Sequence, residues 1–269
     1  MTAERLSVVV PMHRTAANLA TLLQRLGNAV PGAEVVLVDD ACPERSADRA
    51  TEIDRHGLDV GIVRVVPNVG QHAAVQIGAS HATGDIAVVM DADLQDAPED
   101  VPILVANLDA MSAVDAVCAA RTGRYTSPIR QLTATGYRAL VTALTRGRVP
   151  RDAGMFMAVR AESLARISML GDPMAPLVPA LAASGARLRA IPLQRLARVD
   201  GPSSYDTRMR LRVALRALVL LTPARSRLAR RHRARLAALA PNVSVERLES
   251  HRANPACADV SATTYRPES

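Results

Sequence analysis

Short runs of apolar, mostly β-branched residues alternate along the chain with longer stretches in which apolar residues recur at helical spacing. Such alternation predicts βα units that form a mostly parallel, Rossmann-like sheet with helices on both faces. We expect strands at residues 6–10, 34–38, 60–66, 85–90, 115–120, 156–159 and 188–193. We expect helices at residues 16–26, 46–56, 71–81, 98–108, 129–144 and 176–183. The pattern therefore indicates an α/β fold.

Composition narrows the class of protein. Of the 269 residues, 49% are apolar but only 2% are aromatic, which excludes a chain that is disordered throughout and disfavours β-sandwiches and stacking platforms for bases. Cys42, Cys118 and Cys257 are too widely spaced to suggest a disulfide framework or a zinc site, so we expect a reducing, cytoplasmic compartment. The N-terminal apolar run is shorter than a signal-peptide core, and no stretch approaches the ~18 apolar residues of a spanning helix. These features predict a soluble or peripheral protein.

Positive charge is concentrated in one segment. The chain has no Lys, so its 33 basic residues are all Arg, against 26 acidic residues. Residues 205–235 contain ten of these arginines and a single acid, Asp206. We predict two helices in this segment, broken at Thr222 and Pro223, because proline cannot continue a helix interior.

The first of these helices has two distinct faces. Arg208, Arg212 and Arg216 form an i, i+4 row, and another face carries Leu211, Leu215, Leu218 and Val219. Such a helix can lie in the interface of an anionic membrane, or it can pack its apolar face on the preceding domain with its arginines solvated. A nucleic-acid partner is disfavoured, because the segment lacks aromatic residues and a recognisable binding fold. We expect an α/β domain at residues 1–204, an Arg-rich helical extension at 205–240 and a flexible tail at 241–269.

Polar residues follow three of the predicted strands. In an open parallel sheet, ligands bind beyond the carboxyl ends of the strands. The three strand ends read Pro11-Met12-His13, Asp39-Asp40 and Asp91-Ala92-Asp93-Leu94-Gln95. Carboxylates such as Asp91 and Asp93 suit Mg²⁺ or Mn²⁺, which bind through one or two carboxylates and substrate phosphates. Each signal taken alone has a simpler structural explanation, as a helix cap or a polar turn; their joint order favours a site.

The order of motifs VSVVVPMH, VVLVDDACPERS, PNVGQHAAVQIGASHATGD and VVMDADLQDAPE resembles that of the inverting family-2 glycosyltransferases, which have a GT-A fold. The resemblance covers about residues 6–205 and is greatest to the polyprenyl-phosphate sugar synthases of the dolichol-phosphate mannose synthase group. DADLQDAPE is the most specific match. Further agreement comes from Ala120-Arg121, from the DAGMFMAVR run and from Arg198 followed by GPSSY.

The resemblance implies a nucleotide-sugar donor, linked to UDP or GDP, and assigns residues to it. Three would surround the base: Pro11, His13 and Asp40. Two would shape the loop beside the nucleotide: Asn68 and Gly70. Three would hold the divalent metal and the diphosphate: Asp91, Asp93 and Gln95. Two would lie on a loop that closes over the diphosphate: Arg198 and Ser203.

The acceptor is left open between two kinds of nucleophile. The resemblance implies that Arg121 and Arg130 bind an acceptor phosphate, and paired guanidinium groups suit that chemistry. A phosphate monoester is mostly dianionic at neutral pH and needs no general base. An alcohol acceptor needs one, and Asp152 is the candidate.

Three functions therefore remain as hypotheses. The first is metal-dependent, inverting transfer of a sugar, of the hexosyltransferase type, to a polyprenyl phosphate in the cytoplasm or at the inner face of the cell membrane. The second is the same donor chemistry with a soluble hydroxyl acceptor in secondary-metabolite biosynthesis. The third is a noncatalytic protein that binds an anionic surface. The intact DADLQ sequence argues against the third.

Overall fold

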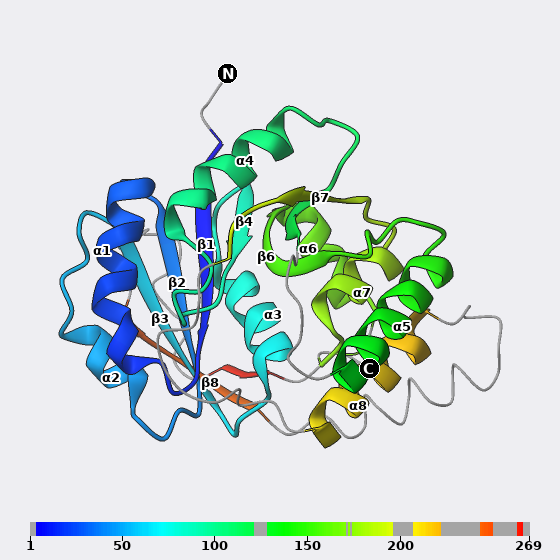
Figure 1. The fold of residues 1–269 in the computed structure, drawn as a ribbon. Coiled ribbons are helices and arrows are strands. Elements are labelled where there is room, and N and C mark those ends of the chain that lie inside the picture. Colours follow the sequence, from blue (N-terminus) through cyan, green and yellow to red (C-terminus); the bar gives the residue numbers. More distant parts are fainter. Residues whose placement is uncertain are drawn as a thin grey trace.

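The computed structural model describes residues 4–120, 128–170, 172, 174–195, 207–221, 243–249 and 263–265 (Figure 1). The strands are β1 (Leu6–Met12), β2 (Glu34–Asp40), β3 (Asp59–Val66), β4 (Ile86–Val89), β5 (Ala116–Ala120), β6 (Ala153–Arg160), β7 (Leu188–Pro192), β8 (Val243–Glu249) and β9 (Thr263–Tyr265). The helices are α1 (Leu19–Ala29), α2 (Ser46–Thr51), α3 (Gln71–His81), α4 (Val101–Asp109), α5 (Pro128–Leu144), α6 (Ala161–Ser168), α7 (Leu177–Ala183) and α8 (Thr207–Leu221).

The strands form one sheet in the order β7-β5-β6-β4-β1-β2-β3-β8-β9. Within the described residues, β6 and β8 run opposite to the other strands, which all point in one direction. The predicted α/β fold with a mostly parallel sheet is therefore confirmed. Residues that follow β1, β2, β3, β4, β5 and β7 lie along one edge of the sheet, together with those that precede β6. This is the edge at which ligands bind in open α/β sheets.

Alternate residues of the buried strands face opposite sides of the sheet, so each strand contributes to two cores. Val8 and Val10 of β1 are buried in the same cluster as Leu22 of α1. Val9, between them, is buried with Ala74 of α3. α1, α2 and α4 cover the first face, whereas α3, α6, α7 and α8 cover the second (Figure 1). Both faces are thus covered, as the runs of consecutive apolar residues in the strands predict.

Most predicted elements occur with small shifts at their ends. α3 has the predicted bounds, and the helix predicted at 16–26 begins as a 3-10 turn, Ala16–Asn18, that leads into α1. α2 ends at Thr51 rather than at residue 56, where His56 and Gly57 have positive φ angles that no helix accommodates. α6 was not predicted, because its eight residues follow β6 with no glycine or proline to mark a new element.

Two strands, β8 and β9, lie within the segment predicted to be a flexible tail, residues 241–269. β8 pairs antiparallel with β3, and β9 pairs with β8. Val243 of β8 is buried in the cluster that contains Val65 and Val69. The second helix predicted in the Arg-rich extension falls in residues 222–242, outside the described part of the chain.

α8 packs on the α/β domain through α5 and α7. Leu220 is buried with Leu181 of α7, and Nη1 of Arg216 lies 3.2 Å from Oδ1 of Asp172. These two charged side chains are only 16% and 4% exposed, so Arg216 does not belong to a solvated or lipid-facing row. Leu215, in contrast, is 54% exposed. Among the helices described, none has the length and apolar character needed to cross a bilayer.

The contact between α3 and the sheet gives a first testable prediction. A Cβ added to Gly78 would lie 2.6 Å from methyl groups of both Val9 and Val38, whereas one added to Gly136 of α5 would meet nothing within 4 Å. We expect Gly78→Ala to destabilise the protein by about 1–3 kcal/mol, because valines in a buried core cannot move aside. Gly136→Ala should have no effect or stabilise slightly, since alanine favours a helix. Urea unfolding measures both, and equal midpoints for the two variants would contradict the packing described.

Candidate active site

Asp40 joins the ends of β1 and β2 to the loop after β3. The side chain of Asn68 donates a hydrogen bond of 2.8 Å to the main-chain oxygen of Asp40, and Nδ1 of His13 lies 3.3 Å from the same oxygen. The backbone N–H groups of Val69 and Gly70 donate to the two carboxylate oxygens of Asp40, at 2.6 and 2.8 Å. The structure thus brings together four residues that were predicted to lie around the nucleotide.

The Asp40 carboxylate holds the loop that carries Asn68. Burial raises the pKa of Asp40, although the two backbone N–H groups and His13 counteract this effect. Gly70 has a φ of +84°, which favours glycine and lets its N–H point at the carboxylate. Pro11, the fifth residue predicted around the nucleotide, is buried in β1 and pairs with Val38.

The Asp39 carboxylate binds a different loop from that bound by Asp40. Its carboxylate accepts hydrogen bonds from the backbone N–H groups of Cys42, at 2.7 Å, and Ala47, at 2.9 Å. Ala47 lies in the first turn of α2, so Asp39 satisfies a helix N–H that has no partner within the helix. The thiol of Cys42 is buried and takes part in hydrogen bonds with the Arg14 N–H and the Ser46 hydroxyl. Asp39 and Cys42 therefore shape the loop after β2.

The carboxylates after β4 lie at the same edge. Asp91 Oδ1 accepts a hydrogen bond from the side-chain amide of Gln71, the first residue of α3. Asp93 Oδ1 accepts one of 3.1 Å from the backbone N–H of Gln95. Leu94, between them, has a φ of +59°, a strained conformation for leucine that keeps this turn tight. Strain of this kind is concentrated at functional sites.

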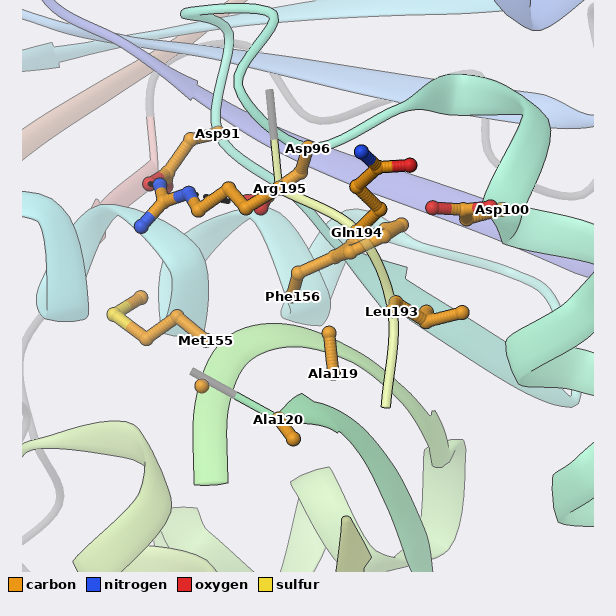
Figure 2. A pocket seen from close by; sticks show the side chains of 11 residues that line it. Asp91, Asp96, Asp100, Ala119, Ala120, Met155, Phe156, Leu193, Gln194 and Arg195 are labelled. Carbon is orange, nitrogen blue, oxygen red and sulfur yellow. Dashed lines mark ion pairs between the residues drawn. The ribbon is translucent and has the colours of Figure 1, made fainter. Parts of the chain in front are cut away.

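Asp91 also lines a pocket that is partly open to solvent (Figure 2). The side chain of Arg195 extends across it, between Asp91 and Asp96. The lining residues come from the ends of β4, β5 and β7 and the beginning of β6: Asp91, Asp96, Asp100, Ala119, Ala120, Gly154, Met155, Phe156, Leu193, Gln194 and Arg195. The pocket is therefore acidic on one side and apolar on the other.

The donor set at this edge fits a hard divalent cation that also binds substrate phosphates. Within the described ranges, no group of three His, Cys, Asp or Glu side chains could hold a metal by itself. Asp91 and Asp93 supply carboxylate oxygens, and Mg²⁺ or Mn²⁺ commonly binds one or two of these and completes its shell with phosphates and water. The residues are thus compatible with a metal that binds together with a nucleoside diphosphate.

The predicted acceptor residues are only partly described. Asp152 is exposed in the turn before β6, and the next residue, Ala153, pairs with Ala120 at the end of β5. Asp152 therefore lies at the same edge as the pocket. Arg130 is in the first turn of α5. Arg121, Arg198 and Ser203 lie outside the described residues.

Two side chains at this edge, those of Gln71 and Arg195, are not among the site residues predicted from the sequence. Gln71 follows Gly70 directly, and a polar residue at the start of a helix gives no signal of its own. Arg195 follows β7, whose carboxyl end lies at the ligand-binding edge, so its place in the sequence is a signal that could identify it. The family motif, however, points to Arg198, three residues later.

Asp40 gives a prediction for nucleotide binding. Asp40→Ala removes the acceptor for two backbone N–H groups and releases the loop that carries Asn68. We expect the affinity for nucleoside diphosphate to fall by about tenfold or more, since hydrogen bonds to a charged group contribute roughly 1.5–3 kcal/mol. Isothermal titration calorimetry measures this affinity. Asp59→Ala, at the opposite end of β3, is the control, and equal affinities for both variants would contradict the role of Asp40.

Comparison with curated proteins finds undecaprenyl-phosphate 4-deoxy-4-formamido-L-arabinose transferases. The protein from Edwardsiella ictaluri is 32% identical over 210 residues, which are 76% of this chain and 64% of that protein. The one from Klebsiella pneumoniae subsp. pneumoniae is 31% identical over 209 residues, 76% of this chain and 63% of that protein. The aligned region thus spans less than two thirds of these relatives.

Solved structures share the fold at lower identity. Glucosyl-3-phosphoglycerate synthase from Mycobacterium tuberculosis, in complex with UDP, matches with a TM-score of 0.58 and 19% identity, over 83% of this chain and 82% of that one. The mannosyltransferase PcManGT from Pyrobaculum calidifontis, in complex with GDP-Man and Mn²⁺, matches with a TM-score of 0.52 and 22% identity, over 88% of this chain and 80% of that one. The model of the glycosyl transferase family 2 matches residues 7–168, more than half of the chain. The chain belongs to glycosyl transferase family 2.

Proposed function

We propose that the chain transfers a sugar from a nucleoside-diphosphate sugar to a polyprenyl phosphate, with inversion at the anomeric carbon. The observation that carries this proposal is the identity of 31–32%, over 76% of this chain, to transferases named for undecaprenyl phosphate. The carboxylates of Asp91 and Asp93 at the ligand-binding edge support it. The fold likeness to proteins solved with UDP, or with GDP-Man and Mn²⁺, is consistent with a donor of this class.

The donor half of the reaction uses the residues around Asp40 and Asp91. Asp40 holds the loop with Asn68 and Gly70, so that His13 and Asn68 form one wall of the nucleotide site. Asp91 and Asp93 would hold Mg²⁺ or Mn²⁺, which, when bound, stabilises the negative charge that develops on the leaving diphosphate. Arg198 and Ser203 would close over that diphosphate, as the family motif implies. Interactions that strengthen as this charge develops accelerate transfer more than they tighten binding.

In the acceptor half of the reaction, we assign the main role to arginine side chains rather than to a general base. Arg121 and Arg130 would bind the phosphate monoester and orient one of its oxygens toward the anomeric carbon. The nucleophile is already mostly dianionic at neutral pH, so Asp152 is not required as a general base.

A donor screen tests this assignment. The full chain is incubated with UDP- and GDP-linked sugars, with and without Mn²⁺, and release of nucleoside diphosphate is followed before and after addition of polyprenyl phosphate. We expect release to depend on Mn²⁺ and to rise at least about tenfold with polyprenyl phosphate, because attack by a bound, oriented nucleophile is faster than hydrolysis. A rise with hydroxyl acceptors alone would favour the soluble-acceptor hypothesis.

We further propose attachment to an anionic membrane surface, where a polyprenyl phosphate resides. Leu140 and Leu144 of α5 are 44% and 41% exposed, and Leu215 lies on the adjacent α8 (Figure 1). Exposed leucines beside an Arg-rich segment suit an interface with anionic lipid, where each basic residue near the surface contributes about 1 kcal/mol.

Vesicle sedimentation tests this attachment. We expect binding that requires anionic lipid and decreases with added salt, and that is weakened by the double variant Leu140→Gln/Leu144→Gln. Ile103→Gln, at an equally exposed leucine-sized residue of α4, is the control. Equal binding to neutral vesicles, or none to either kind, would leave α8 as a structural extension.

A further inference from the structure

One guanidinium connects two carboxylates at the candidate active site. Nε of Arg195 lies 3.2 Å from Oδ1 of Asp96, and Nη2 lies 3.7 Å from Oδ2 of Asp91 (Figure 2). Arg195 belongs to the segment that leaves β7 at the ligand-binding edge. Its side chain therefore occupies the space beside Asp91, where a metal-bound diphosphate would lie under the proposed function.

Asp91 is engaged on both of its carboxylate oxygens. Oδ2 faces Arg195, and Oδ1 accepts the hydrogen bond from Gln71. A divalent cation binds through the lone pairs of these oxygens. A cation that binds to Asp91 must therefore compete with the positive charge of Arg195.

The two contacts of Arg195 are unequal. The contact with Asp96 is shorter, and the Asp96 side chain is only 10% exposed. The contact with Asp91 is longer, and the Asp91 side chain is 21% exposed. Since water screens a more exposed pair more strongly, the Asp91 end is the one that separates more easily. Asp96 thus serves as the fixed attachment of the guanidinium.

We propose that Arg195 is a positioning residue that acts as an exchangeable counter-ion of Asp91. It neutralises and orients the Asp91 carboxylate before the donor binds. When the divalent cation binds, Arg195 releases Asp91 but remains paired with Asp96. The Nη2 group of Arg195 is then free to face the pocket, where it can attract the diphosphate. The second half of this inference rests on the proposed function; the competition with a cation does not.

The test is the affinity of the full chain for Mn²⁺ in the absence of nucleotide, measured from the electron paramagnetic resonance signal of free Mn²⁺. We expect Arg195→Gln to bind Mn²⁺ about tenfold more tightly than the wild type, because a unit charge about 4 Å from a partly exposed carboxylate no longer competes. Arg195→Lys should remain near the wild type, because it keeps the charge. Arg195→Gln/Asp91→Asn should lose the gain.

A matched control and a second variant keep the result decisive. Arg166→Gln removes an arginine of α6 that pairs with Asp115, the residue before β5 and therefore at the end of that strand opposite to the pocket, and should leave the Mn²⁺ affinity unchanged. Arg195→Met, which keeps an unbranched apolar stem without the charge, replaces the glutamine variant if that one does not fold. Mn²⁺ binding by Arg195→Gln and Arg195→Met that is equal to or weaker than that of the wild type, or no detectable binding in any protein, would overturn the proposal.

Activity separates this inference from the proposed function. If Arg195→Gln binds Mn²⁺ more tightly but the wild type transfers no sugar to polyprenyl phosphate, the counter-ion role stands and the assigned reaction fails. If transfer occurs while the Mn²⁺ affinity does not respond to residue 195, the reaction stands and the counter-ion role is wrong.

Discussion

Asp93→Asn should lower the turnover of sugar transfer by at least about 100-fold, the loss typical of removing one electrostatic stabiliser of a transition state. The substitution keeps the size of the side chain and the oxygen that accepts the hydrogen bond from Gln95, so the tight turn at Leu94 is preserved. What is lost is the carboxylate charge that would bind the metal. The measurement is kcat at saturating donor and acceptor, with unchanged thermal unfolding as evidence that the fold is intact.

The chain offers a matched control for this variant. Asp54 accepts a hydrogen bond of 2.9 Å from the backbone N–H of His56, which repeats the local geometry of Asp93 and Gln95 in an exposed turn far from the pocket. Asp54→Asn should leave kcat unchanged. Near-normal turnover of Asp93→Asn, or full activity of the wild type in EDTA, would exclude a metal held by these carboxylates.

The second large effect distinguishes a phosphate acceptor from an alcohol acceptor. If the acceptor is a phosphate monoester, Arg121→Ala should slow transfer by about 100-fold or more, because charge-assisted contacts to phosphate are lost, while slow hydrolysis of the donor persists. Asp152→Asn should cost tenfold or less, since a dianionic nucleophile needs no base. Initial rates of transfer and of hydrolysis, measured side by side, report both effects.

Arg189→Ala, at an exposed position of β7, is the control for the loss of a positive charge. It should change neither rate. The opposite ranking, in which Asp152→Asn is the more severe variant, would favour a hydroxyl acceptor. The exposed position of Asp152 at the edge of the sheet is compatible with such a base.

The part of the fold predicted from the sequence is the part that local patterns determine. The runs at β1, β2 and β4 are buried on both faces and therefore stand out as apolar throughout. β8 was missed because it is stabilised by pairing with β3, across a large separation in sequence, and its own pattern is interrupted by a register shift.

The candidate site was predictable where motif and topology coincide. His13, Asp40, Asn68 and Gly70 were predicted to lie together, and their hydrogen bonds show that they do. The family motif assigns Asp40 to the nucleotide, but the role of Asp39 could not be predicted, because it depends on hydrogen bonds from the backbone N–H groups of the loop after β2. Nor could the ion pairs of Arg195, which depend on where the segment after β7 crosses the pocket.

The central claim is the transfer of a sugar to a polyprenyl phosphate with inversion. Its most direct test is the NMR spectrum of the lipid-phase product formed by the full chain with Mn²⁺, the donor identified in the screen and undecaprenyl phosphate. We predict a sugar joined through its anomeric carbon to the lipid phosphate, with the configuration opposite to that in the donor. The account would be contradicted if the lipid phase contained no sugar although the donor was consumed or its sugar appeared on an alcohol. A product that retains the anomeric configuration of the donor would also contradict it.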